Sequence, residues 1–360
     1  MNTKNLFDKL KKSQLLLPVI AMLLVMAVNI IHDAFTGAGA FSFFTITLQN
    51  TTGNGTILYG RIIDILNRGS EAALLALGMT LVVSASAGTD ISVGSVMSLC
   101  ASFCCMLLAG YGVSSTNELA VPLILGVLAG MLMGCACGAF NGFLVARLNI
   151  QPMVATLILY SAARAIGLLL CNDLIVYVRN NSFGFFGSFL GPIPTPIIIT
   201  AVCVALLSII LKKTALGLYI QSVGINSKAS RIAGLNSKMI IHLAYIVCGL
   251  FAGIAGIVAS SRITSADSNN IGLYLEMDAI LAVALGGNSL GGGKFSLAGS
   301  IIGAYTIQAI TTTLYALGVS TNQAPVFKAI IVIIIVAIQA PPVKAFIKKK
   351  SLSKSSKGVA

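Results

Sequence analysis

Charged residues are scarce in this 360-residue chain. Asp, Glu, Lys and Arg together make up 9% of it, against about 25% in an ordinary soluble domain. Hydrophobic residues make up 57%, and a soluble fold of this length could not cover so much apolar surface with a polar exterior. The composition therefore excludes a soluble protein and predicts an integral membrane protein that forms a membrane-spanning pathway.

Histidine is almost absent, and the usual signatures of enzymes are missing with it. The two histidines, His32 and His242, stand far apart, so there is no H-E-x-x-H motif. No G-x-S-x-G nucleophile motif occurs either. No cysteine pair has zinc-ribbon spacing, so we expect neither a metal site nor a disulfide framework, and no catalytic residue. The eight cysteines, all in or beside apolar segments, are Cys100, Cys104, Cys105, Cys135, Cys137, Cys171, Cys203 and Cys248.

Acidic residues are few, 10 against 23 basic ones, and the net charge is +13. In a soluble protein such a charge would suggest nucleic-acid binding. Here the basic residues lie mainly in the tails and in short segments between apolar runs, as the positive-inside rule requires of a membrane protein. We therefore expect the lipid bilayer as a partner and no nucleic acid.

Ten apolar stretches have about the length that crosses the hydrocarbon core. They cover approximately 15–34, 71–86, 92–110, 120–145, 151–171, 195–211, 239–261, 276–287, 296–316 and 326–340. The short spans 71–86 and 276–287 are typical of broken helices that line a pathway. The sequence therefore predicts an all-α, polytopic fold with about ten transmembrane helices.

The start of the chain allows two interpretations. Basic residues precede the first apolar run, and Ala38-Gly39-Ala40 is similar to a signal-peptide cleavage site. The run is longer than a typical signal core, however, and further spans follow it. A retained first helix is the preferred interpretation.

Most basic residues fall on the same side as both termini when ten spans are assumed, which makes that side cytoplasmic. We expect a cytoplasmic N-terminus over 1–14, a transmembrane domain over 15–340 and a basic cytoplasmic tail over 341–360. The outer segments are then 35–70, 172–194, 262–275 and 317–325. Within the first of these, 35–58 has the composition of a loop and 59–70 has the helical spacing of an interfacial helix.

The longest cytoplasmic loop, 212–238, carries five basic residues and no acidic one. A short helix is predicted over 226–233, with Asn226 as its N-cap and Gly234 at its end. Its small residues Ala229 and Ala233 would allow it to dock into the groove of a partner. The alternative is a solvated loop whose charges only set the topology.

A polar stretch over 84–94 interrupts two apolar runs. Asp90 lies in it, and a carboxylate near membrane depth is costly. Asp90 or Ser92 would accept backbone N–H bonds at the start of the third span, or line a polar pathway.

A glycine-rich stretch over 276–294 is similar to a phosphate loop only at first glance. The G-x-x-x-x-G-K-[ST] pattern needs Gly at Asn288 and Ser or Thr at Phe295. We therefore expect no cofactor in this chain and no ATP hydrolysis by it. The few intramembrane charges also speak against an ion-coupled carrier.

Taken together, these motifs resemble the membrane permease subunit of bacterial ATP-binding-cassette (ABC) sugar importers of the ribose/galactose type. The first motif is Ala76-Leu77-Gly78-Met79-Thr80-Leu81-Val82 with Gly88-Thr89-Asp90-Ile91-Ser92-Val93-Gly94. The second is Val223-Gly224-Ile225-Asn226 with Ala229, Ala233, Gly234 and Leu235. The third is Glu276-Met277-Asp278-Ala279-Ile280 with Gly286-Gly287-Asn288-Ser289-Leu290. The segment from Asn149 to Leu157 adds a fourth. Residues 58–68 and 266–273 look most similar to galactofuranose-type permeases.

The resemblance implies a type II-like ABC importer permease in the cytoplasmic (inner) membrane of a bacterium. Its partners would be an ABC ATPase subunit that binds ATP and Mg²⁺, an extracytoplasmic sugar-binding protein, and a second permease chain, either the same or a sister. The cargo would be a monosaccharide, a hexose or pentose.

The resemblance also implies roles for individual residues. Coupling to the ATPase would involve Gly224, Asn226, Ala229, Arg231, Ala233 and Gly234. The translocation pathway would include Ser84, Ser86, Thr89, Asp90, Ser92, Asn288 and Gln308. The chain departs from the family pattern at Ala87, where a glycine is usual, at Thr89 and at Ser230. An ion-coupled secondary carrier or channel for small polar solutes, and an intramembrane enzyme, are the competing hypotheses.

Overall fold

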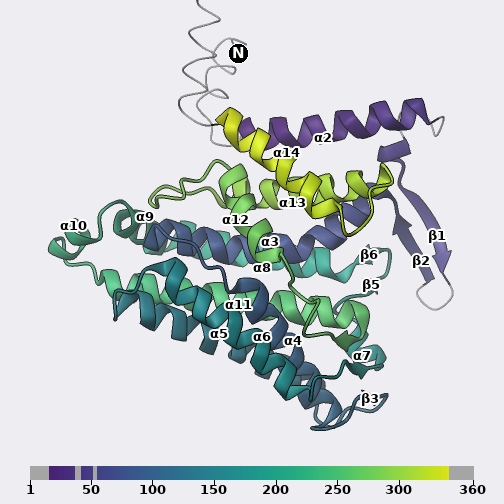
Figure 1. Cartoon of the computed structure of the whole chain (residues 1–360), viewed down its shortest axis with the longest axis horizontal. Helices are drawn as coiled ribbons and strands as arrows, with labels where there is room; N and C mark the ends of the chain where they lie inside the picture. Colours follow the sequence, from purple (N-terminus) through teal and green to yellow (C-terminus); the bar gives the residue numbers. More distant parts are fainter. Residues whose placement is uncertain (1–15, 37–41, 52–54, 340–360) are drawn as a thin grey trace, which may run out of the picture.

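The computed structural model describes residues 16–36, 42–51 and 55–339, and it is built almost entirely of helices (Figure 1). Each of the ten predicted spans corresponds to a helix. These are α2 (Leu16–Phe35), α3 (Arg61–Ser86), α4 (Val93–Ala109), α5 (Leu123–Ala146), α6 (Pro152–Leu170), α8 (Thr195–Lys213), α11 (Ser237–Ile263), α12 (Leu275–Leu285), α13 (Leu297–Ala316) and α14 (Ala324–Gln339). The predicted all-α polytopic fold is confirmed. The predicted cytoplasmic ends, 1–14 and 341–360, lie outside the described residues.

Seven of these helices are long and apolar enough to cross a membrane, within the part of the chain that the structure describes. The other three, α4, α12 and α14, have 17, 11 and 16 residues. Helix α12 is therefore the one short, glycine-terminated span that the sequence predicted correctly, since Gly286 and Gly287 follow it directly.

The prediction of a separate interfacial helix over 59–70 and a short span over 71–86 is wrong. The two segments form one continuous helix of 26 residues, α3. Gly69 and Ser70 do not break it. Gly69 is there for packing, since it lies against the ring of Tyr305, where a Cβ atom would come within 2.7 Å of a ring carbon. At 1.5 Å per residue, α3 is about 39 Å long.

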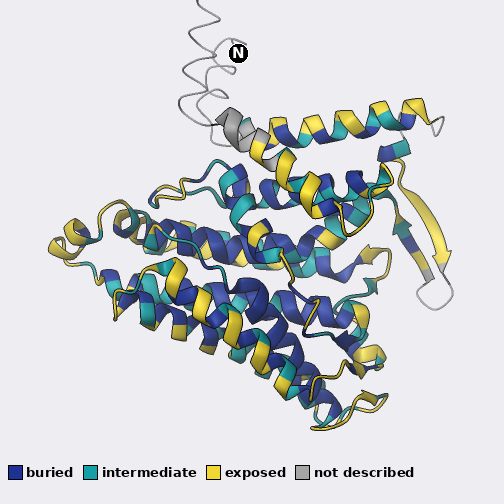
Figure 2. Ribbon diagram, viewed as in Figure 1, coloured by how far each residue is buried: buried dark blue, intermediate teal, exposed yellow. Residues whose placement is uncertain are grey.

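Helix α3 runs through the centre of the molecule, between α11 and α13 (Figure 1). Most of its residues are buried, as its dark colour in Figure 2 shows, although its mean hydropathy of 1.4 is still that of a membrane span. Helices α5, α6 and α8 instead expose most of their residues. Hydropathy alone does not separate the two kinds of span, because α5 and α11 share a mean hydropathy of 2.2 but are 28% and 61% buried.

The crossing of α5 and α11 explains part of the high glycine content. Gly134 and Gly138 of α5 lie directly on the backbone of α11, where a Cβ atom on either would overlap the carbonyl oxygen of Gly249 or Tyr245. Glycine allows the two backbones to approach this closely, as in other membrane helix pairs.

One end of the molecule carries the short strands (Figure 1). Strands β3 (Ser115–Thr116), β4 (Val176–Val178) and β7 (Ser265–Ala266) form one sheet. They come from three different connections between helices. Strands β4 and β7 lie in the predicted outer segments 172–194 and 262–275, and β3 lies between the third and fourth spans, which alternation of the ten spans also puts outside. Their pairing is consistent with that topology.

The predicted loop over 35–58 is wrong in its second half. Strands β1 (Thr47–Thr51) and β2 (Gly55–Tyr59) pair as an antiparallel hairpin, preceded by the 3-10 turn η1 (Ser42–Phe44). The amide of Leu58 donates a hydrogen bond of 3.0 Å to the carbonyl of Pro192. This bond attaches the hairpin to the turn between β5 (Phe189–Leu190) and β6 (Ile193–Pro194), a contact that the local composition could not reveal.

Candidate functional site

At the end of the molecule opposite the strands, two short helices project between α8 and α11 (Figure 1). They are α9 (Leu216–Ile225) and α10 (Ser227–Ile232). The side chain of Asn226 caps α10, since its Oδ1 accepts a hydrogen bond of 2.9 Å from the amide of Ala229. Gly234 has a φ of +88° and follows the end of the helix. The predicted helix and both of its capping residues are confirmed, with bounds one residue shorter at each end.

The outward face of α10 is exposed and partly apolar (Figure 2). Ala229, Arg231 and Ala233 are exposed, whereas Ser230 is buried. Ile225 is 68% exposed and Ile232 is 90% exposed. Two isoleucines at the tip of a basic loop are what a protein partner would cover. The sequence analysis missed both, although apolar residues in an otherwise polar loop were a usable signal.

Gly224 joins this tip to the centre of the molecule. It packs so tightly on the last turn of α3 that a Cβ atom would overlap the carbonyl oxygen of Ser84. The same carbonyl accepts a hydrogen bond of 3.0 Å from the amide of Gly293. The end of α3, the end of α9 and the glycine-rich turn after α12 therefore meet at one point.

Asp90 lies in the connection between α3 and α4 and is only 3% exposed. Its Oδ1 accepts hydrogen bonds from the amide of Ser92 at 2.9 Å and from the hydroxyl of Ser92 at 2.6 Å. The prediction that Asp90 accepts a backbone N–H at the start of α4 is confirmed. Of the two residues offered for this role, the structure selects Asp90, because the side chain of Ser92 makes no capping bond and donates to Asp90.

Asn141 completes the group around Asp90. It reaches in from α5, is 1% exposed, and donates a hydrogen bond of 2.9 Å to the hydroxyl of Ser92. The sequence analysis did not identify it. A single amide in an otherwise apolar span was the available signal, because such groups need a polar partner in a membrane.

Asn288 holds the glycine-rich turn in place. Its Oδ1 accepts from the amide of Ser296 at 2.6 Å, and its Nδ2 donates to the carbonyl of Val283 at 3.1 Å and to the hydroxyl of Ser300 at 2.8 Å. The hydroxyl of Thr80 on α3 donates to the same Ser300 at 2.6 Å. A polar chain thus joins α3, the turn and α13.

The proposed pathway residues fall into two places. Ser84, Asp90, Ser92 and Asn288 are buried near the inner end of α3, and Ser86 and Thr89 are half-buried beside them. Gln308 is remote from this group, because it lies on α13 next to Gly69, in the other half of α3. In this conformation most of these side chains bond to the protein, so their contact with a solute stays a prediction.

Ala87 shows why a glycine is usual at its position. It caps the C-terminus of α3 with a φ of +52°, in the left-handed region that glycine adopts freely and alanine does not.

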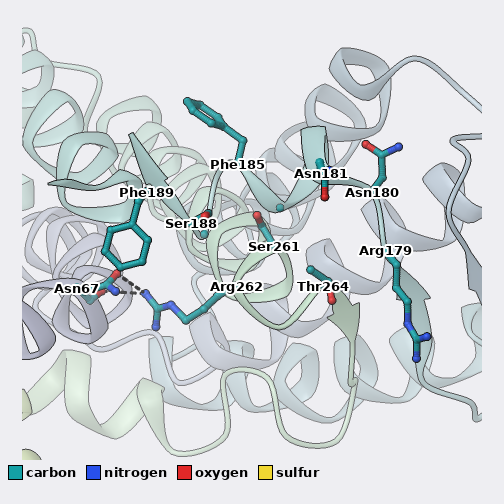
Figure 3. A pocket seen from close by; sticks show the side chains of 12 residues that line it. Asn67, Arg179, Asn180, Asn181, Phe185, Ser188, Phe189, Ser261, Arg262 and Thr264 are labelled. Carbon is teal, nitrogen blue, oxygen red and sulfur yellow. Dashed lines mark hydrogen bonds between the residues drawn. The ribbon is translucent and has the colours of Figure 1, made fainter. Parts of the chain in front are cut away.

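A polar hollow of about 860 Å³ lies at the strand-bearing end (Figure 3). The start of α3, the segment 179–189 and the end of α11 form its walls. Arg262 lies at its base, where Nη1 is 2.8 Å from Oε1 of Glu71 and Nη2 donates to the carbonyl of Asn67 at 2.8 Å. The sequence analysis assigned no function to this region.

A second ion pair joins two membrane helices. Nζ of Lys328 on α14 lies 2.8 Å from the carboxylate of Asp278 on α12, and both side chains are mostly buried. No cluster of His, Cys, Asp and Glu that could hold a metal ion occurs in residues 16–36, 42–51 and 55–339.

Comparison with known proteins supports a transport role. The family model described as "Branched-chain amino acid transport system / permease component" matches residues 61–338. The chain is 40% identical to the galactofuranose transporter permease protein of Escherichia coli (strain K12) over 332 residues, which are 92% of this chain and 91% of the relative. It is 35% identical to the fructose import permease protein of Bifidobacterium longum (strain NCC 2705), covering 99% and 97%. It is 34% identical to the ribose import permease protein of E. coli (strain K12), covering 81% and 89%.

Proposed function

The chain belongs to the family of branched-chain amino acid transport system permease components, and we propose that it is the permease subunit of an ABC importer for a monosaccharide. The cargo is a hexose or a pentose, the class to which the sugars named for its relatives belong. Separate ATPase subunits bind and hydrolyse ATP. A sugar-binding protein outside the membrane delivers the sugar, and a second permease chain, a copy or a sister, completes the pathway.

One observation carries this proposal: the capped helix α10 presents an exposed apolar tip and is fixed to α3 through Gly224. A partner that binds Ile225, Ile232 and Arg231 would move α9 and α10 as a rigid body. Because Gly224 has no side chain to deform, that movement passes directly to the carbonyl of Ser84 and to the turn at Gly293. The coupling role of Asn226, Ala229, Ala233 and Gly234 is to form and end this helix.

The polar residues around Ser84, Asp90 and Asn288 form the gate in this proposal. The C-terminal end of α3, the Asp90 group and the turn held by Asn288 surround the point that α9 touches. When ATP binding pulls α10, these segments separate and expose the hydroxyls and carboxylate around Ser84 to the sugar. Weak, dispersed contacts suit transport, since tight binding would trap the cargo.

The chain lies in the cytoplasmic membrane in this proposal, with α10 and both termini on the cytoplasmic side. The basic residues of the 212–238 loop favour that side. The outer side then holds the sheet of β3, β4 and β7 and the hollow at Arg262.

Reconstitution tests the proposed function directly. The permease is placed in proteoliposomes with and without the ATPase and the sugar-binding protein, and uptake of labelled galactofuranose, fructose and ribose is measured. We expect uptake only when all components and ATP are present. Uptake by the lone chain in an ion gradient would establish a secondary carrier instead.

A further inference from the structure

The hollow at the strand-bearing end is assembled from segments far apart in the sequence. Asn67 comes from α3, Asn181 and Phe189 from the segment after α6, and Arg262 from the end of α11 (Figure 3). Its volume of about 860 Å³ lies within the usual range for small-molecule sites, roughly 300–1,000 Å³.

The walls of the hollow are braced by polar contacts. Arg262 bonds to both Glu71 and Asn67 of α3. The hydroxyl of Ser261 donates a hydrogen bond of 2.5 Å to the carbonyl of Phe183, which ties α11 to the segment after α6. Gly187 lies so close to the backbone of Arg262 that a Cβ atom would overlap it. The hollow is therefore a preformed site, since its shape does not depend on loose loop contacts.

The chemistry of the lining fits a neutral, polyhydroxylated ring. Amides such as those of Asn67 and Asn181 both donate and accept hydrogen bonds, as sugar hydroxyls do. The ring of Phe189 lies over the pair formed by Asn67 and Arg262 (Figure 3), where it offers a flat apolar surface to the C–H face of a sugar. None of the described residues that line the hollow is acidic. Glu71 balances the charge of Arg262, and the guanidinium of Arg179 stacks on the ring of Tyr177, 5.3 Å from its centroid.

The position of the hollow connects it to the coupling tip. Asn67 and Ser84 lie on the same helix, α3, 17 residues and about 26 Å apart. A displacement of the inner end of α3 by α9 therefore tilts or shifts the wall that carries Asn67. A partner bound to α9 and α10 can therefore change the shape of the hollow without touching it.

We propose that this hollow is the outer waiting site of the permease, where a neutral monosaccharide binds before it crosses the membrane. This inference rests on the proposed function for the identity of the ligand. The amide of Asn181 contacts the hydroxyls, and Phe189 contacts the apolar face of the ring.

Chemical protection tests the site without depending on transport. Asn181→Cys is prepared in membrane vesicles that carry the whole importer, and its reaction with a membrane-impermeant maleimide is followed with and without millimolar galactofuranose, fructose or ribose. Asn269→Cys is the matched control, since Asn269 is an exposed outer asparagine that does not line the hollow. The native chain measures the background from its own cysteines.

We expect at least one sugar to slow labelling of Asn181→Cys about threefold or more and to leave Asn269→Cys unchanged, since binding buries most of the surface of such a site. We also expect Phe189→Leu to raise the KM for uptake of that sugar about fivefold with little change in the maximal rate, because an aromatic contact contributes about 1 kcal/mol. Phe44→Leu, which changes an exposed phenylalanine that does not line the hollow, should leave the KM unchanged.

The waiting site is overturned if no sugar slows the labelling of Asn181→Cys relative to labelling without sugar and if Phe189→Leu leaves the KM unchanged. The proposed function would then still stand. Failure of the native importer to take up any of the sugars contradicts the proposed function instead.

Discussion

Gly224 of α9 touches the carbonyl oxygen of Ser84, the last turn of the central helix, with no side chain between them. Here the exposed tip of α9 and α10 meets both the 84–94 segment and the turn at Gly293. Three segments that the sequence analysis singled out separately therefore lie in direct contact.

Replacement of Gly224 by alanine should uncouple that unit. The added methyl group would push α9 away from Ser84 and break the packing, so we expect ATP-dependent uptake to fall about tenfold or more while ATP hydrolysis by the complex continues, as overpacking costs about 1–3 kcal/mol. The ratio of sugar transported to ATP hydrolysed in proteoliposomes measures this. Gly291→Ala is the control, because the nearest atom to its Cβ would be a serine hydroxyl at 3.5 Å. Equal ratios in the two variants would contradict the coupling role of Gly224.

The tip itself should tolerate no charge reversal or added bulk. Arg231→Glu, Ala229→Trp and Ile232→Asp alter exposed positions, so the chain should still insert and fold. We expect each to reduce co-purification of the ATPase and to lower uptake about tenfold, the scale of a lost interface contact of 1–2 kcal/mol. Tyr111→Asp, which changes a 73% exposed residue on the opposite end, should behave like the native chain. Normal ATPase binding in all three tip variants would show that α10 is only a solvated connection.

Ala87→Gly should stabilise the protein. Alanine at a φ of +52° carries a conformational cost, and its removal should gain about 1 kcal/mol. Thermal unfolding in detergent should therefore shift upward by a few degrees. Ala85→Gly, inside the last turn of α3, should do the reverse, because glycine in a helix interior costs about 0.5–1 kcal/mol. A lower midpoint for Ala87→Gly would mean that its methyl contact with the neighbouring turn outweighs the backbone strain.

The ion pair between Lys328 and Asp278 should show strong coupling. Lys328→Met or Asp278→Asn leaves one mostly buried partner without its counterpart, and each should destabilise the fold by about 3 kcal/mol. The double variant should be markedly more stable than the sum of the two single changes predicts. The coupling is measured by comparing the free energies of unfolding of the native chain, the two single variants and the double variant. If the effects of the two single changes simply add in the double variant, the two charges act independently.

Local signals in the sequence were sufficient to predict the membrane spans and α10. The apolar runs predict ten helices, and Asn226 and Gly234 delimit α10, because caps and hydropathy act over a few residues. The same local reasoning failed at Gly69, which lies inside the continuous helix α3 and packs against the ring of Tyr305, 236 positions away. It failed again for the hairpin, whose attachment to Pro192 is a distant contact.

The candidate sites are formed by contacts between residues far apart in the sequence. Asp90 was recognised from its own chemistry, but Asn141 reaches it across 51 positions. The hollow arises from Arg262 bonding to Asn67 across 195 positions, and nothing in either segment indicates the other. A single sequence carries no record of such pairs.

The glycine-faced crossing of α5 and α11 has a mechanical consequence. Carbonyl groups of each helix sit in notches of the other at Gly134, Gly138 and Gly249, so neither can slide lengthwise without lifting out of register. We therefore expect α5 and α11 to move together as one rigid body. In the proposed transport cycle, the inward and outward openings would then form beside this helix pair and not between its two members.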